Sequence, residues 1–216
     1  MNFKGVIFDL DGTLADTGAD LADAINLMLQ SFGFEAKSQS DILKHINFGA
    51  RAFVGGCLPE DAKDISDEAF TRYIGFYRER CLDKTYIYGG VPELIKTLVE
   101  YDIKLCVLSN KPDDTTKKIV SGLLDAGDFT EIIGGSDKFP HKPSPESSLY
   151  LANEMRARPD EIVFIGDSDV DMKTAVNASM FPLGVSWGYR TENVILGAGA
   201  KKIAHNPGEI LEFILK

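Results

Sequence analysis

Short apolar runs alternate with amphipathic segments over most of the chain, and this alternation is the feature that most restricts the possible folds. The runs stay apolar at consecutive positions and end abruptly at Asp, Gly, Ser or Asn, which is typical of strands buried on both faces of a parallel sheet. We expect strands within 3–8, 103–110, 131–135, 161–168, 182–187 and 202–205. Helical patterns occupy 91–101, 112–124, 144–155, 169–178 and 207–215. Regular alternation of this kind predicts an α/β fold with a doubly wound, Rossmann-like parallel sheet.

One stretch breaks the alternation. Residues 15–84 contain no convincing strand pattern, and most of this stretch has the spacing of amphipathic helices. We therefore expect a small α-helical domain at 15–84, inserted into an α/β core made of residues 1–14 and 85–216. The hinges of such a domain would lie at 14–20 and 83–90.

Charge and cysteine content narrow the classes of function. The 216 residues carry 33 acidic and 23 basic side chains, a net charge of −10. An acidic chain is a poor partner for nucleic acid and for anionic membrane surfaces, so we expect neither. The three cysteines (Cys57, Cys81 and Cys106) form no CxxC pair, which argues against a disulfide framework or a zinc site. No signal peptide or stretch of about 18 apolar residues is present, so we expect a cytoplasmic protein. Nothing in the sequence indicates an oligomeric state.

Polar residues follow four of the expected strands at the point where each strand ends. In an open parallel sheet, ligands bind beyond the carboxyl ends of the strands, so these side chains should meet at one edge. They are Asp9 and Asp11, then Ser109, Asn110 and Lys111, then Lys142, and finally Asp167 and Asp171.

Four carboxylates in one crevice would repel one another and raise each other's pKa values. Lys142 offsets only one of the four negative charges. A divalent cation would relieve the repulsion, and an oxygen-only ligand set in an open crevice suits Mg²⁺. Each motif alone has an ordinary structural explanation, such as a turn, a helix cap or a surface lysine. Their joint presence, in order along one sheet edge, favours a phosphate-processing site.

These motifs resemble those of the haloacid dehalogenase-like hydrolase superfamily, in its phosphoglycolate phosphatase-like branch. The resemblance rests on DLDGT at 9–13, Ser109 within LSNKP, Lys142 within KPSPE, and GDSDVD at 166–171. The segment VSWGYR (185–190) and the helical stretch at 15–84, which matches that family's cap, extend it over nearly the whole chain. It implies a Mg²⁺-dependent phosphatase, a phosphoric monoester hydrolase, that acts on a small phosphorylated metabolite.

The resemblance also implies roles for the carboxylates. Asp9 would be the nucleophile that forms an aspartyl phosphate and would also contact Mg²⁺. Asp11 would protonate the leaving oxygen and later activate water, while its backbone carbonyl binds the metal. Asp167 would bind Mg²⁺ directly. Asp171 would hold a metal-bound water or Lys142 from outside the metal's own ligand set.

We expect other residues to bind phosphate and to select the substrate. By the same resemblance, Ser109, the backbone N–H of Asn110 and Lys142 would hold the transferring phosphoryl group. Arg51, in the expected cap, is the candidate for a contact with a second anionic group of the substrate. A solvent-exposed surface arginine is an equally ordinary interpretation of Arg51.

Several alternatives stay open. A phosphosugar mutase of the same fold would use the same motifs, although Thr13 in DLDGT resembles the hydrolases more than the mutases. A non-catalytic, phospho-accepting signalling domain also uses acidic residues, Mg²⁺ and a lysine, but the length of the chain and its helical insertion argue against it. Among substrates, phosphoglycolate, pyrophosphate, nucleotides and sugar phosphates remain possible.

Overall fold

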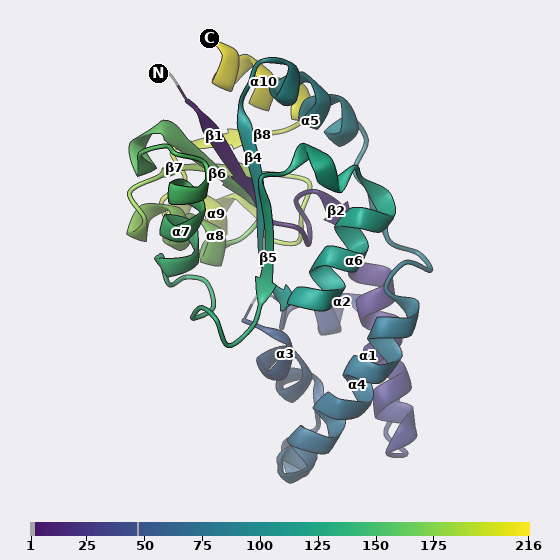
Figure 1. The fold of residues 1–216 in the computed structure, drawn as a ribbon. Helices are drawn as coiled ribbons and strands as arrows, with labels where there is room; N and C mark the ends of the chain where they lie inside the picture. The colour runs from purple at the N-terminus through teal and green to yellow at the C-terminus, as the bar shows by residue number, and fades with distance from the viewer. Residues whose placement is uncertain (1–2, 47) are drawn as a thin grey trace.

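Six parallel strands form the central sheet, in the order β5-β4-β1-β6-β7-β8 (Figure 1). The computed structural model describes residues 3–46 and 48–216, so the first two residues of the expected core lie outside it. The strands are β1 (Gly5–Phe8), β4 (Lys104–Pro112), β5 (Glu131–Gly135), β6 (Ile162–Gly166), β7 (Phe181–Val185) and β8 (Lys202–Ala204). This arrangement confirms the expected doubly wound α/β fold.

Helices cover both faces of the sheet because its strands carry apolar side chains in both directions. In β1, Val6 and Phe8 belong to one buried cluster, which includes residues of α5, α6 and α10, while Ile7 belongs to a second cluster with residues of α7 and α8. The covering helices are α5 (Val91–Glu100), α6 (Asp113–Leu123), α7 (Glu146–Glu154), α8 (Asp169–Asn177), α9 (Glu192–Gly197) and α10 (Pro207–Leu215). The sequence pattern predicted all of them except the short α9.

The stretch at 15–84, here called the helical insertion, lies beyond one end of the sheet (Figure 1). It contains α1 (Gly18–Ser31), α2 (Gln39–Leu43), α3 (Ala50–Cys57), the 3₁₀ segment at Glu60–Ile65 and α4 (Ser66–Arg80). A two-stranded antiparallel ribbon of β2 (Ala15–Asp16) and β3 (Tyr86–Ile87) joins it to the core. The sequence pattern missed β2, because a two-residue strand is too short to show alternation.

The buried carboxylate of Asp20 ties the two connections of the insertion together. It accepts hydrogen bonds from the backbone N–H of Lys84 at 3.0 Å and of Thr85 at 2.9 Å, and from the Thr85 hydroxyl at 2.7 Å. Asp20 is 1% exposed, so these donors replace the water that a carboxylate requires. Asp20 therefore holds the two chain connections side by side at the base of the insertion.

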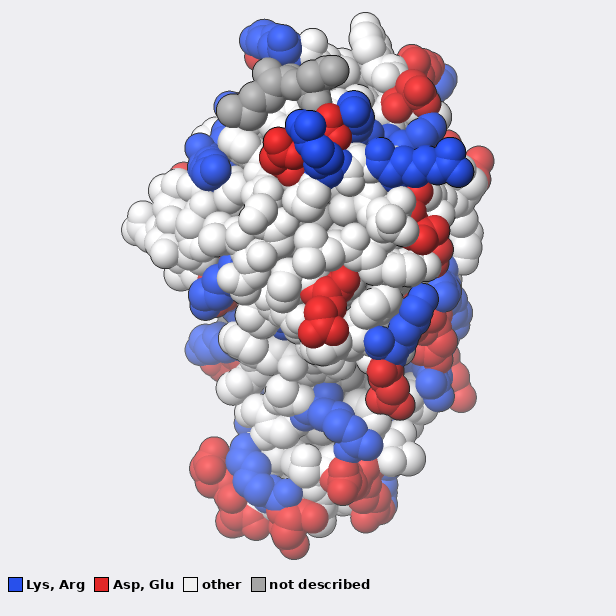
Figure 2. Space-filling view, turned by 60° about the vertical axis from the view of Figure 1, so that its left-hand side comes forward, with Lys and Arg blue, Asp and Glu red and all other residues white. Residues whose placement is uncertain are grey.

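Figure 2 shows charged residues of both signs beside one another, most densely at the two ends of this face, while much of its upper middle is uncharged. No helix in the described part of the chain combines the length and the apolar character needed to cross a bilayer.

Candidate active site

The loop after β1 turns sharply and brings two carboxylates to the edge of the sheet. The backbone N–H of Asp9 donates to the Ile165 carbonyl at 2.9 Å, so the chain still follows β6 at this point. Three residues later the turn passes through Gly12, whose φ of +80° favours glycine. A Cβ at Gly12 would lie 2.4 Å from Asp167 Oδ2, so the close approach of the two loops also requires glycine.

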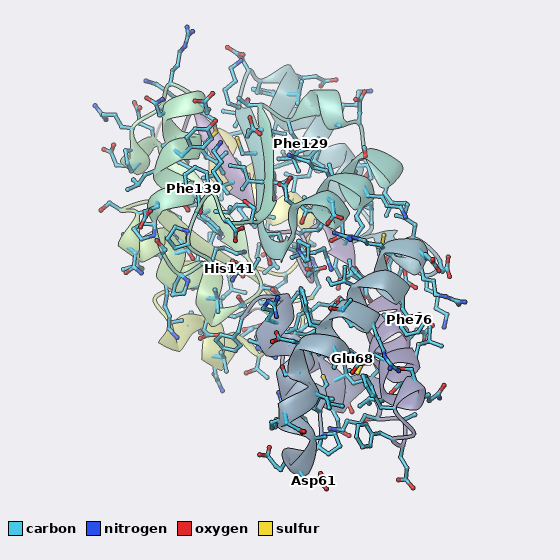
Figure 3. All side chains as sticks on the ribbon, turned by 60° about the horizontal axis from the view of Figure 1, so that its bottom comes forward. Asp61, Glu68, Phe76, Phe129, Phe139 and His141 are labelled. Atoms are coloured by element: carbon cyan, nitrogen blue, oxygen red, sulfur yellow. The ribbon has the colours of Figure 1, made fainter. Side chains whose placement is uncertain are left out.

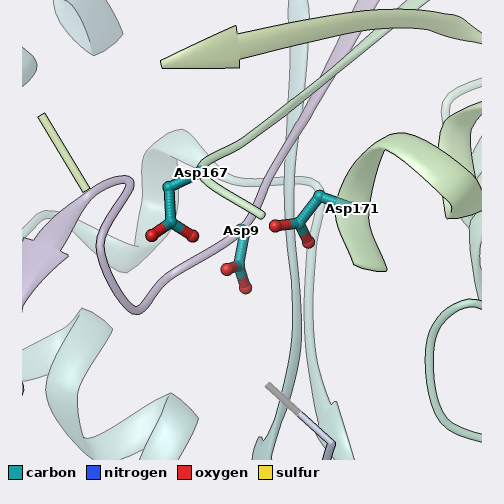
Figure 4. A group of neighbouring side chains, drawn as sticks. All are labelled: Asp9, Asp167 and Asp171. Atoms are coloured by element: carbon teal, nitrogen blue, oxygen red, sulfur yellow. The ribbon is translucent and has the colours of Figure 1, made fainter. Parts of the chain in front are cut away.

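Asp9, Asp167 and Asp171 converge at the carboxyl ends of β1 and β6, where the strand order reverses (Figure 4). Each offers a carboxylate oxygen within 4.8 Å of the others, and all three side chains are buried. Burial, followed by the charge of Asp171, raises the pKa of Asp9 to about 7. Burial also raises the pKa of Asp167 well above its ordinary value, again with Asp171 as the next cause. The cluster therefore binds positive charge strongly.

Lys142 supplies part of that charge. Its ammonium donates to Asp9 Oδ1 at 2.8 Å, to Asp171 Oδ1 at 2.6 Å and to the Leu108 carbonyl at 3.1 Å. Burial opposes a charged lysine, but Asp171 and Asp9 outweigh it, and the pKa of Lys142 rises above its ordinary value. Lys142 is therefore a permanent cation beside Asp9.

The side chain of Asn110 holds the loop that carries Lys142. Its amide donates to the Lys142 carbonyl at 3.0 Å, and its oxygen accepts from the Lys142 backbone N–H at 2.8 Å. Ser109 lies beside it and is buried, and its hydroxyl accepts from the Lys111 backbone N–H at 3.2 Å. The structure thus places Ser109, Asn110 and Lys142 together next to Asp9, as the strand ends predicted.

The donor set fits a hard divalent cation. Asp167 Oδ1 is buried and has no hydrogen-bond partner among the described residues, which leaves it available as a ligand. Its other oxygen accepts from the Tyr189 backbone N–H at 2.6 Å. Both oxygens of Asp171 have partners, Lys142 for one and Ser168 for the other, which suits a supporting position outside the metal's own ligands. Asp9 and Asp167 are the side chains that could hold Mg²⁺.

Lys111 is a second buried cation at the site, and the sequence pattern gave it no role. Its ammonium lies 3.0 Å from Asp11 Oδ1 and 2.7 Å from the hydroxyl of Tyr77 on α4. The hydroxyl of Thr17 donates to the same oxygen of Asp11. With Lys111 included, two lysines and one divalent cation would balance the four carboxylates, whereas the count from sequence left an excess negative charge.

A cavity of about 40 Å³ lies above these groups. Asp9, Asp11, Ser109 and Lys142 line it on the core side. The helical insertion contributes its other walls through Leu21, Ile46, Gly49, Ala50, Phe53 and Tyr73. The polar groups of the core thus face a mostly apolar wall that the helical insertion provides.

Arg51 does not line this cavity. It lines an outer cleft of about 420 Å³ with Phe70 and His141, and His141 lies where the core faces the insertion (Figure 3). The Arg51 side chain is 66% exposed, forms an ion pair with Asp67 and stacks over Phe70 at 4.3 Å. The structure therefore brings together every predicted site residue except Arg51.

Comparison with known proteins agrees with this site. The family model for haloacid dehalogenase-like hydrolases matches residues 6–185. Curated phosphoglycolate phosphatases from Psychrobacter arcticus (31% identical, covering 100% of this chain and 97% of the relative) and Vibrio parahaemolyticus (27%, covering 99% and 96%) are similar over their full length. The solved structure of a predicted phosphoglycolate phosphatase from Haemophilus somnus superposes with a TM-score of 0.88 at 27% identity, covering 99% of this chain and 98% of that one.

The chain belongs to the haloacid dehalogenase-like hydrolases. The expected superfamily and its phosphoglycolate phosphatase-like branch are confirmed, as is the expected enzyme class, a phosphoric monoester hydrolase.

Proposed function

We propose that the protein is a Mg²⁺-dependent phosphatase that hydrolyses a small phosphorylated metabolite, with phosphoglycolate as the leading substrate. The observation that carries this proposal is the cavity in which Asp9 and Asp11 lie next to Ser109 and Lys142. Leu21, Phe53 and Tyr73 of the helical insertion line the same cavity, and walls this close to the catalytic groups favour a short leaving group over a nucleoside or a sugar ring. The names of its relatives point to the same substrate.

In the proposed mechanism, Asp9 attacks phosphorus and the bond to the leaving oxygen breaks, giving an aspartyl phosphate. Asp11 gives a proton to the leaving oxygen and then takes one from the water that hydrolyses the intermediate. Lys142, Ser109 and the Asn110 backbone hold the phosphoryl oxygens, because phosphoryl transfer depends on positioning and charge neutralisation. Bound Mg²⁺ would neutralise phosphoryl charge, held by Asp9, the Asp11 carbonyl and Asp167, with Asp171 in support.

We also propose that residues 15–84 act as a mobile cap over the core of residues 1–14 and 85–216. The walls that the insertion contributes to the cavity support this division, since a movement of these helices would change access to the catalytic groups.

A panel of phosphorylated metabolites with Mg²⁺, scored by kcat/KM, tests the proposal. We expect phosphate release from phosphoglycolate to exceed that from nucleotides and sugar phosphates. Asp9→Asn should fold normally, lose turnover and fail to incorporate phosphate, because an amide cannot attack phosphorus. A sugar phosphate converted to its isomer without release of phosphate would instead support the mutase. A persistent phosphoprotein with negligible turnover would support the signalling domain.

A further inference from the structure

The hydroxyl of Tyr77 lies at the contact between the helical insertion and the catalytic carboxylate Asp11. Tyr77 comes from α4 and is fully buried, and its ring stacks on Tyr73 with centroids 5.6 Å apart. Its hydroxyl accepts a hydrogen bond from the Lys111 ammonium at 2.7 Å. The buried Tyr77 side chain therefore brings its one polar atom, the hydroxyl oxygen, into contact with the Lys111 ammonium of the core.

Lys111 also contacts Asp11, so it connects Tyr77 with this carboxylate. Its ammonium lies 3.0 Å from Asp11 Oδ1, and both side chains are buried. Because an ammonium has three N–H donors on a flexible stem, a second partner is needed to hold it in one direction. Tyr77 is that partner, through its hydroxyl and through its ring face, whose centroid lies 4.4 Å from the ammonium.

Two side chains contact the same oxygen of the Asp11 carboxylate. Lys111 and the hydroxyl of Thr17 both approach Oδ1. Thr17 occupies the N-cap position of α1, yet its side chain makes no cap hydrogen bond and donates to Asp11 instead. Both contacts engage Oδ1, so neither Lys111 nor Thr17 occupies Oδ2, the other oxygen of the Asp11 carboxylate.

We propose that Tyr77 and Lys111 are positioning residues that orient Asp11 for proton donation when the helical insertion is closed over the core. The inference rests on the proposed phosphatase mechanism. In that step the bond from phosphorus to the leaving oxygen breaks, a bond from phosphorus to Asp9 forms, and the proton moves from Asp11 Oδ2 to the leaving oxygen. With the insertion displaced, the Lys111 ammonium loses Tyr77 and Asp11 loses its fixed direction.

Two small substrates separate this role from a structural one. Phosphoglycolate releases an alkoxide that must be protonated, whereas acetyl phosphate releases acetate, which leaves without a proton. Single-turnover release of glycolate and of acetate should be measured with Mg²⁺ for wild type and Tyr77→Phe, which keeps the ring and removes one oxygen. We expect Tyr77→Phe to slow glycolate release about tenfold and acetate release less than about twofold. Tyr101→Phe, at an exposed position, should change neither rate.

Different outcomes would overturn the positioning role of Tyr77 and the proposed function. Equal losses on both substrates, or no loss on either, would overturn the positioning role while wild type still hydrolyses phosphoglycolate. Wild type that hydrolyses acetyl phosphate but no alkyl phosphate would overturn the proposed function and this inference with it. Should Tyr77→Phe fail to fold, as judged by thermal unfolding, Lys111→Met provides the second test, and the same preferential loss of glycolate release is expected.

Discussion

The ammonium of Lys142 lies 2.8 Å from the carboxylate of Asp9, and 133 residues of chain separate the two. Both side chains are buried, and the same ammonium contacts Asp171. One lysine therefore neutralises only part of a crowded acidic cluster. The remaining repulsion, added to the loss of hydration, is why the Asp9 carboxyl binds its proton more tightly than in water.

Stability without metal should fall as pH rises from about 4 to about 7. In the folded protein the pKa of Asp9 is raised from 3.8 to about 7, so the folded state holds a proton that the unfolded chain loses near pH 4. The free energy of unfolding should then drop by as much as about 4 kcal/mol over this window, at about 1.4 kcal/mol per pKa unit. Urea unfolding in EDTA at stepped pH measures this slope. Asp9→Asn should reduce the slope to the part contributed by Asp167, whose pKa is also raised. An unchanged slope in that variant would assign the effect to other groups.

Activity should require a hard divalent cation. EDTA should abolish turnover and Mg²⁺ should restore it, because Asp9 and Asp167 offer only oxygen ligands. Ca²⁺ should inhibit, since it takes more ligands at longer distances and would draw both oxygens of Asp9 away from phosphorus. Titration of metal-free enzyme with each cation, followed by phosphate release, is the measurement. Full activity in EDTA would contradict the metal site.

Gly188→Ala should weaken Mg²⁺ binding by about tenfold or more, as expected when a group that supports a metal ligand is disturbed. A Cβ at Gly188 would lie 2.2 Å from Asp167 Cβ, so Asp167 must move. Isothermal titration with Mg²⁺ provides the test. Gly197→Ala is the matched control, because a Cβ there meets no atom within 4 Å. Equal Mg²⁺ affinity in the two variants would show that Asp167 does not depend on this packing.

Arg51→Ala should leave KM for phosphoglycolate within about twofold of wild type. The guanidinium is exposed, pairs with Asp67 and stacks on Phe70, and exposed ion pairs of this kind contribute about 0–1 kcal/mol. Steady-state kinetics on phosphoglycolate are sufficient to decide. A rise in KM of tenfold or more would instead favour the contact with a second substrate anion that the sequence suggested.

Asp20→Ala should destabilise the protein by about 3 kcal/mol, because it leaves three donors of Lys84 and Thr85 unpaired at a buried junction. Asp23→Ala is the control: Asp23 is exposed and pairs with the Lys84 ammonium, so its loss should cost less than about 1 kcal/mol. Chemical denaturation of both variants gives the comparison. Similar losses would mean that the buried carboxylate does not hold the junction.

Most of the fold and the central residues of the site could be predicted from the local pattern of apolar and polar residues in the sequence. Consecutive apolar residues predicted the six strands, and parallel strands have their carboxyl ends at one edge. Asp9 and Asp167 directly follow β1 and β6, Ser109 lies in the last part of β4, and Lys142 lies in the loop after β5. Chain order therefore predicted that they meet. The charges of these residues then implied a cation without any knowledge of distances.

Tertiary structure alone decided how the helical insertion faces the core. The link from Tyr77 through Lys111 to Asp11 and the outward position of Arg51 both depend on the packing of α3 and α4. That packing is set by contacts between residues far apart in the chain, and helical periodicity shows which face of a helix is buried but not what it is buried against. The sequence therefore determined the doubly wound parallel sheet and the acidic cluster, while non-local packing decided which cations and hydroxyls reach Asp11.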